Sequence, residues 1–89
     1  MLTESDRLSI TELAAKYQVK RVLLFGSSAR ADSDGRDIDI AVEGIRPKDF
    51  FKFYGELIFK LSKPVDVVDL SQESKFTSLV RKEGILLYG

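Results

Sequence analysis

Two short groups of residues stand out for the chemistry they can perform. Gly26-Ser27 follows one apolar run, and Asp37-Ile38-Asp39 opens another. A glycine after a strand lets the backbone approach a phosphate closely, and N–H groups at the start of a helix favour an anion. The Ser27 hydroxyl and the Arg30 guanidinium, one helical turn further on, are additional donors to phosphate oxygens. The alternative for Gly26-Ser27 alone is an ordinary strand-to-helix turn with a capping serine.

Asp37 and Asp39 have the spacing of two side chains on one face of a strand. Residues i and i+2 of a strand lie about 6.6–7 Å apart and point the same way, so the two carboxylates can hold one or two hard cations. Oxygen ligands suit Mg²⁺, which also keeps waters and substrate phosphates. The alternative is a half-exposed strand with one solvated face. Two negative charges on one face repel each other, and a cation would remove that repulsion.

Asp66 is a third candidate, because it lies within the apolar stretch Val65–Asp69. An acid inside a buried strand is unusual unless it is paired or bound to a cation. If this strand neighbours the Asp37-Ile38-Asp39 strand, Asp66 can share its metal or accept a proton from an attacking hydroxyl. The alternative for Asp66 is a salt bridge to Lys20 or Lys63.

Apolar periodicity and turn residues predict the elements that position these side chains. Helices are expected over residues 4–17, 27–31, from Pro47 to about 61, and 72–83. Strands are expected over residues 19–25, 37–43 and 65–70, with an edge strand at 85–88. The last helix is expected to begin at a Ser71 cap and to end at Gly84 in the C′ position.

The order is α-β-α-β-α-β-α, which predicts a single domain over residues 1–89 with an α/β (α+β) fold. We expect a small mixed sheet of three to four strands flanked by helices. The first strand brings its carboxyl end to the site through Gly26, whereas the other two bring aspartates near their amino ends. The first strand must therefore run antiparallel to the other two.

The helix after Pro47 carries many apolar residues. Its main apolar face is expected to comprise Phe50, Phe51, Tyr54, Leu57, Ile58 and Leu61. Phe53 is expected away from this face, either exposed at a protein interface or packed at the edge of the face. Gly55 lowers the stability of the helix.

Composition narrows the classes of function. The 14 basic and 14 acidic residues give zero net charge, which argues against direct binding of nucleic acid. The chain has no cysteine and no histidine, so catalysis must use carboxylates, hydroxyls, lysine, arginine and a hard metal. Neither a signal peptide nor a membrane-length apolar run is present, and a cytoplasmic protein is expected. A chain of 89 residues has no room for a second lobe, so a large substrate must lie on an open face or be held by a partner.

Taken together, three stretches resemble the motif set of the polymerase-beta-like nucleotidyltransferase superfamily, and within it the minimal nucleotidyltransferases. They are Phe25-Gly26-Ser27-Ser28-Ala29-Arg30, Asp37-Ile38-Asp39-Ile40 and Val65-Asp66-Val67-Val68. The resemblance covers nearly the whole chain. It implies that Gly26, Ser27 and Arg30 bind the triphosphate of ATP, and that Asp37 and Asp39 ligate Mg²⁺. It also implies that Asp66 completes the metal site and helps to activate the acceptor.

The resemblance further implies an antitoxin that transfers AMP to a tyrosine of an α-helical HEPT-domain partner. Two residues depart from the family pattern: Ala31 stands where glycine is common, and Arg36 stands where serine is common. A non-catalytic module that neutralises its partner by contact, or a nucleotide or metal sensor, remains an alternative. The complete set of three aspartates favours the enzyme.

Overall fold

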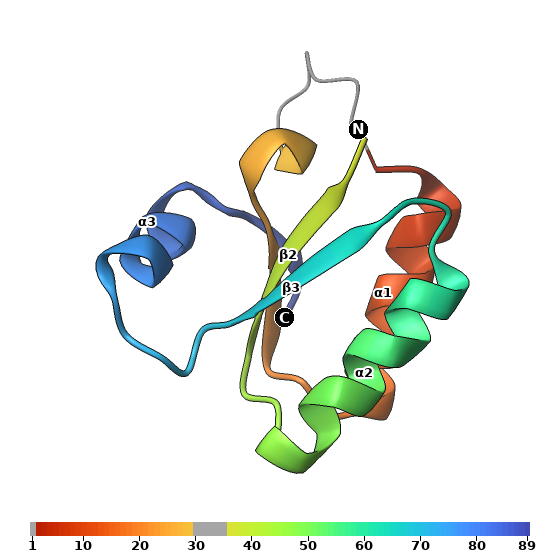
Figure 1. The fold of residues 1–89 in the computed structure, drawn as a ribbon, viewed down its shortest axis with the longest axis horizontal. Coiled ribbons are helices and arrows are strands. Elements are labelled where there is room, and N and C mark those ends of the chain that lie inside the picture. Colours follow the sequence, from red (N-terminus) through yellow and green to blue (C-terminus); the bar gives the residue numbers. More distant parts are fainter. Residues whose placement is uncertain (1, 30–35) are drawn as a thin grey trace.

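The computed structural model describes residues 2–29 and 36–89, and helices alternate with strands along them (Figure 1). The helices are α1 (Glu4–Lys16), α2 (Pro47–Lys60) and α3 (Lys75–Glu83), with a 3-10 turn, η1 (Gly26–Ala29). The strands are β1 (Arg21–Leu24), β2 (Ile38–Glu43), β3 (Val65–Asp69) and β4 (Ile85–Tyr88). The expected fold class and element order are confirmed. Within these residues, no helix is both long and apolar enough to span a bilayer.

The strands form one mixed sheet in the order β3-β2-β1-β4. β1 pairs antiparallel with β2, and β2 pairs parallel with β3. The expected antiparallel direction of the first strand is therefore confirmed. β4 pairs antiparallel with β1 at the sheet edge, as expected for the apolar tail.

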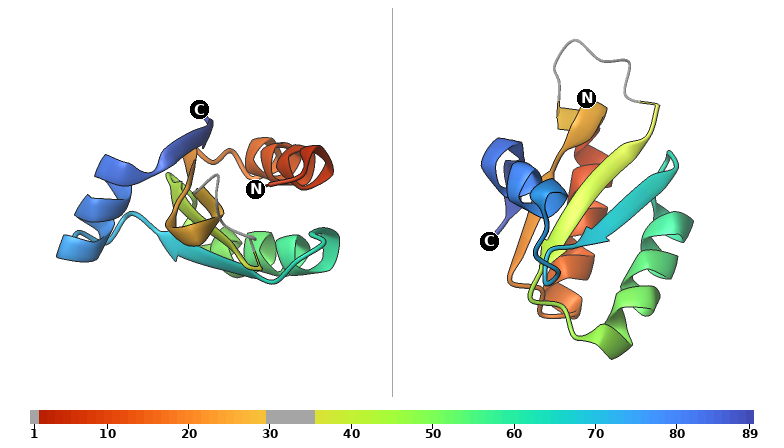
Figure 2. Two further views of the ribbon diagram at one scale, coloured as in Figure 1. Left: turned by 90° about the horizontal axis from the view of Figure 1, so that it is seen from above. Right: turned by 60° about the vertical axis from the view of Figure 1, so that its left-hand side comes forward.

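The helices lie on both sides of the sheet (Figure 2). α1 and α2 cover one face and bury the larger core, in which Ile38, Ile40 and Val42 of β2 take part. The opposite face is covered in part by α3, where Leu23, Ala41, Leu70 and Val80 pack together. Because side chains alternate along β2, Asp39 lies on the same face as Ala41, the face of α3.

The apolar face of α2 differs from the expected one. Phe53 is fully buried and forms an edge-to-face ring contact with Tyr17 at 6.0 Å, so of its two expected placements the exposed one is wrong and the packed one holds. Phe51 and Ile58, which were expected on the buried face, are 80% and 62% exposed. At about 100° per residue, Phe53 falls within one stripe with Leu57, whereas Phe51 and Ile58 fall at the side of that stripe.

The ends of α3 also differ from the expected ones. Ser74, not Ser71, caps this helix: its hydroxyl accepts a hydrogen bond from Thr77 N at 3.1 Å, and the Thr77 hydroxyl accepts one from Ser74 N at 2.8 Å. The amide of Ser71 donates instead to the Asp69 carboxylate. Gly84 ends the helix with φ −66° and ψ 153°, an extended conformation that leads directly into β4, so the expected C′ geometry is wrong.

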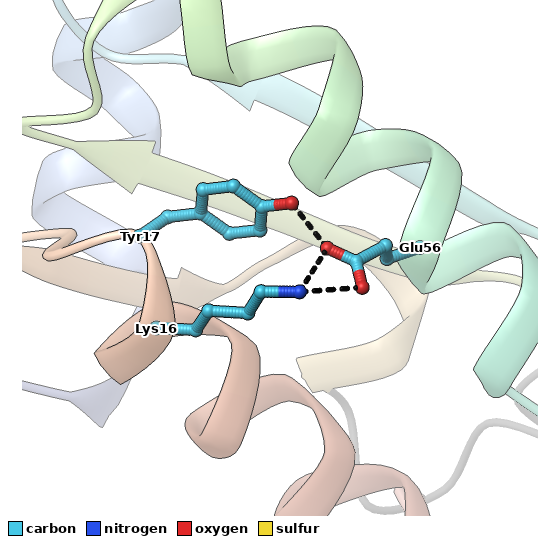
Figure 3. Close-up of polar contacts among 3 residues, drawn as sticks. All are labelled: Lys16, Tyr17 and Glu56. Atoms are coloured by element: carbon cyan, nitrogen blue, oxygen red, sulfur yellow. Dashed lines mark hydrogen bonds and ion pairs between the residues drawn. The ribbon is translucent and has the colours of Figure 1, made fainter.

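Polar contacts join α1 to α2 and to the segment that follows α2. Near the amino end of α1, the buried Asp6 carboxylate accepts hydrogen bonds from the amide and hydroxyl of Ser62, at 3.1 and 2.6 Å. At its carboxyl end, Lys16 and Tyr17 both donate to the carboxylate of Glu56 (Figure 3). These contacts fix the two helices as one layer behind the sheet.

Candidate active site

Gly26 places the first strand's end against the second strand. The amide of Phe25 donates to Asp39 O at 3.0 Å, and Gly26 follows with φ +63°. A Cβ atom at Gly26 would lie 2.8 Å from Asp39 Oδ2, closer than side chains pack. The left-handed backbone favours glycine here, and a Cβ atom would also displace the Asp39 carboxylate. The short helix expected over residues 27–31 appears in the described residues as a 3-10 turn, η1, that begins one residue earlier, at this glycine.

The parallel register pairs Asp39 directly with Asp66. Both lie on the sheet face opposite the α1–α2 layer, where adjacent strands are about 4.8 Å apart. Asp39 is half-buried and Asp66 is exposed, while Asp37 is exposed just before β2 begins. The expected neighbourhood of the second and third strands is therefore present, and the three carboxylates lie toward the same end of the sheet.

The three carboxylates interact electrostatically. Burial raises the pKa of Asp39 above the ordinary aspartate value, and the negative charges of Asp66 and Asp37 raise it further. Burial and two neighbouring negative charges disfavour the ionised form of a carboxylate. A bound cation stabilises that ionised form strongly. Within residues 2–29 and 36–89, no Asp66 ion pair with Lys20 or Lys63 is formed, so the salt-bridge alternative receives no support there.

These carboxylates fit a hard divalent cation by their chemistry. The ligands are oxygen atoms with excess negative charge, as Mg²⁺ prefers. The described side chains do not form a ready group of three metal ligands. A cation at Asp39 would therefore complete its coordination with water and substrate phosphate, which is usual for Mg²⁺.

The structure describes only some of the residues that were predicted to bind phosphate. Gly26 contributes its backbone beside Asp39. Ser27 lies within η1, but its side chain is outside the described residues, as is the whole of Arg30. The departure at Ala31 is also outside them, whereas Arg36 is exposed next to Asp37. The roles of Ser27 and Arg30 in binding phosphate stay predictions.

A pocket of about 520 Å³ adjoins Gly26 and was not predicted. Phe25 and Phe76 meet on its wall with an edge-to-face contact of 5.8 Å. It is lined by Phe25, Gly26, Ala29, Phe76, Leu79, Val80, Glu83 and Ile85. The helical spacing of Phe76, Leu79 and Glu83 is a local sequence signal for the α3 side of this wall. No local signal points to Phe25 and Gly26, which lie some fifty residues earlier.

α3 is held beside this pocket by two polar contacts. Arg81 donates to Leu70 O at 2.8 Å and lies 3.4 Å from the Glu43 carboxylate. Glu43 also lies 3.4 Å from Arg21, so the end of β2 links α3 to β1. This network joins α3 to both β1 and β2.

Comparison with known proteins gives a consistent result. The family model described as "Polymerase beta, Nucleotidyltransferase" matches residues 9–89. No curated protein matches the chain significantly. Several solved structures match it.

A crystal structure of a toxin–antitoxin complex with AMP-PNP contains a chain with 27% identity, matched over 93% of this chain and 73% of that chain with a TM-score of 0.76. A crystal structure of the toxin–antitoxin pair MntA-HepT matches at 25% identity over 98% and 73%, with a TM-score of 0.72. A structure of tri-AMPylated Shewanella oneidensis HEPN toxin with MNT antitoxin matches at 26% identity over 94% and 70%, with a TM-score of 0.71. With the family model matching over nearly its whole length, this chain belongs to the polymerase-beta nucleotidyltransferase family.

Proposed function

We propose that this chain is an antitoxin that transfers AMP from ATP, with Mg²⁺, to a tyrosine hydroxyl of a helical HEPT-domain toxin. The observation that carries the proposal is the contact between Gly26 and the Asp39 carboxylate, with Asp66 paired beside it in the sheet. This arrangement puts a backbone suited to phosphate next to carboxylates suited to the cation that phosphate brings. The family membership and the AMPylated toxin complex of a similar chain support the same chemistry.

Each residue has a proposed role. The backbone of Gly26, with the Ser27 hydroxyl and Arg30, binds the triphosphate. Asp37 and Asp39 hold Mg²⁺, which when bound neutralises the phosphates and orients in-line attack. Asp66 completes the site and receives the proton of the acceptor hydroxyl.

The reaction is a single displacement at phosphorus. The acceptor oxygen forms a bond to the α-phosphorus of ATP while the bond from that phosphorus to the oxygen bridging the β-phosphate breaks. Pyrophosphate leaves, and AMP remains on the acceptor as a phosphodiester. The nucleoside is proposed to lie against the aromatic wall of the neighbouring pocket, where Phe76 offers an apolar surface to a flat base.

The acceptor is proposed to belong to a protein. The carboxylate face of the sheet is covered only in part by α3, and Asp66 is exposed on it. An open face suits a hydroxyl presented by a partner better than a small molecule that the site must enclose. Similar chains occur in complexes with toxin partners, which supports a helical toxin as this partner.

Neutralisation by contact alone is the second candidate. One observation favours it: the exposed Arg36, at a position where serine is common in the family, adds a positive charge next to Asp37 in the sequence. Under this reading the nucleotide site is not needed for protection, and substitution of its aspartates leaves protection intact.

The test is intact mass spectrometry of a HEPT-domain partner incubated with this protein, ATP and Mg²⁺. We expect the partner to gain one or more adenylyl groups, and we expect Asp39→Asn or removal of the metal by a chelator to abolish the gain. Asp69→Asn is the matched control, because Asp69 lies on β3 with its carboxylate turned to the Ser71 amide. A partner that binds tightly but gains no mass with the unsubstituted protein would favour the contact-only function.

A further inference from the structure

The outer surface of α2 carries an apolar groove far from the carboxylates. Phe51 and Phe59 lie on its rim and are 80% and 91% exposed. The groove has a volume of about 470 Å³ and continues to Tyr17 at the end of α1. Since α2 covers the sheet face opposite Asp39, this surface is separate from the proposed active site (Figure 2).

Gly55 lies at the middle of the groove. Phe51, Gly55 and Phe59 follow one another at i, i+4 and i+8 along α2. The two phenylalanines are therefore separated by about 12 Å along the axis, with a gap between them. A Cβ atom at Gly55 would meet nothing within 4 Å, so packing within this chain does not require glycine there. Glycine is unfavourable in a helix interior, and the fold offers no compensating contact.

The groove is flanked by positive charge. Its one acid, Glu56, already accepts hydrogen bonds from Lys16, at 2.9 and 3.1 Å, and from the Tyr17 hydroxyl (Figure 3). Lys52 and Lys60 also line the groove and are exposed. Neither enters an ion pair with any residue in the described ranges.

We propose that this groove binds an amphipathic α-helix of a partner protein, with an apolar side chain over Gly55 and acidic residues against Lys52 and Lys60. The gap between Phe51 and Phe59 has the length of about two helical turns, which suits one inserted side chain and its neighbours. Glycine lets the partner's backbone approach closely, which explains its presence here. The rim of exposed aromatic side chains is typical of a surface that binds protein.

A second copy of this chain fits the groove less well. Two copies paired through α2 would bring lysines toward lysines, and Glu56 is already engaged by Lys16 and Tyr17. Like charges at an interface oppose binding. The charge pattern therefore favours an acidic partner, and this inference does not depend on the proposed transfer of AMP.

The test uses two synthetic amphipathic helices with the same leucine face, one flanked by glutamates and the other by lysines. Binding to this protein is measured by fluorescence anisotropy. We expect the acidic helix to bind at least about tenfold more tightly than the basic helix, with the difference falling as salt rises. Gly55→Leu fills the gap and is expected to weaken binding by about tenfold or more, as is Phe59→Ala.

Controls separate binding from folding. Gly55→Leu adds a side chain in open space, so its melting temperature should not fall below that of the unsubstituted protein. Leu8→Ala removes a comparable exposed apolar side chain from α1, where Leu8 is 50% exposed, and should leave binding unchanged. Equal binding of both helices, no binding of the acidic helix, or binding unaffected by Gly55→Leu would overturn the proposal. Self-association that Gly55→Leu abolishes would also overturn it and would assign the groove to a second copy.

Discussion

The raised pKa of Asp39 has a consequence for stability. Burial, Asp66 and Asp37 all favour its protonated form in the folded chain. The folded state therefore binds this proton more tightly than the unfolded state does. The stability that comes from protonation is complete at low pH and is lost as pH rises through the raised pKa. At pH 7 without metal, the ionised carboxylate lowers the free energy of unfolding.

Asp39→Asn is accordingly expected to stabilise the metal-free protein at pH 7, by less than about 1 kcal/mol because the half-open site is screened by solvent. Near pH 3, where an ordinary aspartate is protonated, the difference should vanish. Thermal melts at both pH values measure this difference in stability between Asp39→Asn and the unsubstituted protein, with Asp69→Asn as the control. Adding Mg²⁺ should raise the melting temperature of the unsubstituted protein and of the Asp69→Asn control, but not that of Asp39→Asn. A variant that melts lower than the unsubstituted protein at pH 7 without metal would contradict the electrostatic description.

Gly26→Ala tests the contact between the glycine and the carboxylate. The new methyl group would lie 2.8 Å from Asp39 Oδ2 on a backbone with φ +63°, so either the strand end or the carboxylate must shift. A displacement of about 1 Å in a site that positions reactants can cost about a hundredfold in rate. We expect a loss of that size in the initial rate of AMP transfer, and no change for Leu8→Ala, which lies outside both proposed sites. A Gly26→Ala protein with the full rate would show that this contact does not position the catalytic carboxylate.

The candidate site residues could be proposed from the sequence because each follows a local rule, and their roles stay predictions. Glycine after an apolar run and aspartates at i and i+2 indicate a phosphate turn and a shared face without any tertiary information. The pairing of Asp39 with Asp66 depended on which strands are neighbours, and the structure provides that pairing. The buried Asp6 was not predicted as a tertiary contact, since its partner Ser62 is distant in sequence.

At the scale of elements, glycine has opposite roles in α2 and in the turn before it. Gly55 lies in a helix interior with open space where its Cβ would be, so Gly55→Ala should raise the free energy of unfolding by about 1 kcal/mol. Gly44 follows β2 with φ +83°, and a Cβ there would lie 2.6 Å from Lys20 Cβ. Gly44→Ala should therefore lower the free energy of unfolding by more than about 1 kcal/mol. Urea unfolding of both variants measures the two changes in the free energy of unfolding. Changes of the same sign would contradict the packing around these two glycines.

The elements were predicted better than their faces and ends. Periodicity located α2 but assigned Phe51 to the core, because a run dense in apolar residues fits several stripes equally well. In the structure, the buried stripe is the one that contains Phe53, whose ring contacts Tyr17 at the end of α1. Similarly, Ser71 and Ser74 are both acceptable caps, and the reciprocal bonds with Thr77 decide between them. Such choices depend on contacts that local sequence does not contain.

At the scale of the whole molecule, the sheet separates two surfaces. The carboxylates and Gly26 lie on the α3 face, and the groove of α2 lies outside the helical layer on the other face. Lysines flank the groove, whereas Asp37, Asp39 and Asp66 lie near one another on the other surface, so the two surfaces differ in charged residues although the net charge is zero. A protein with this division can hold a partner on one side while the other side binds nucleotide.

This division predicts that the two surfaces bind independently. Gly55→Leu should leave the affinity for a non-hydrolysable ATP analogue with Mg²⁺ unchanged, and Asp39→Asn should leave the affinity for the acidic helix unchanged. Sites without shared contacts are usually additive to within about 0.5 kcal/mol. Calorimetric titration of the single and double variants with each ligand completes the cycle. A coupling energy above about 1 kcal/mol would mean that occupation of the α2 groove is transmitted through the sheet to the carboxylates, so that partner binding and nucleotide binding regulate each other.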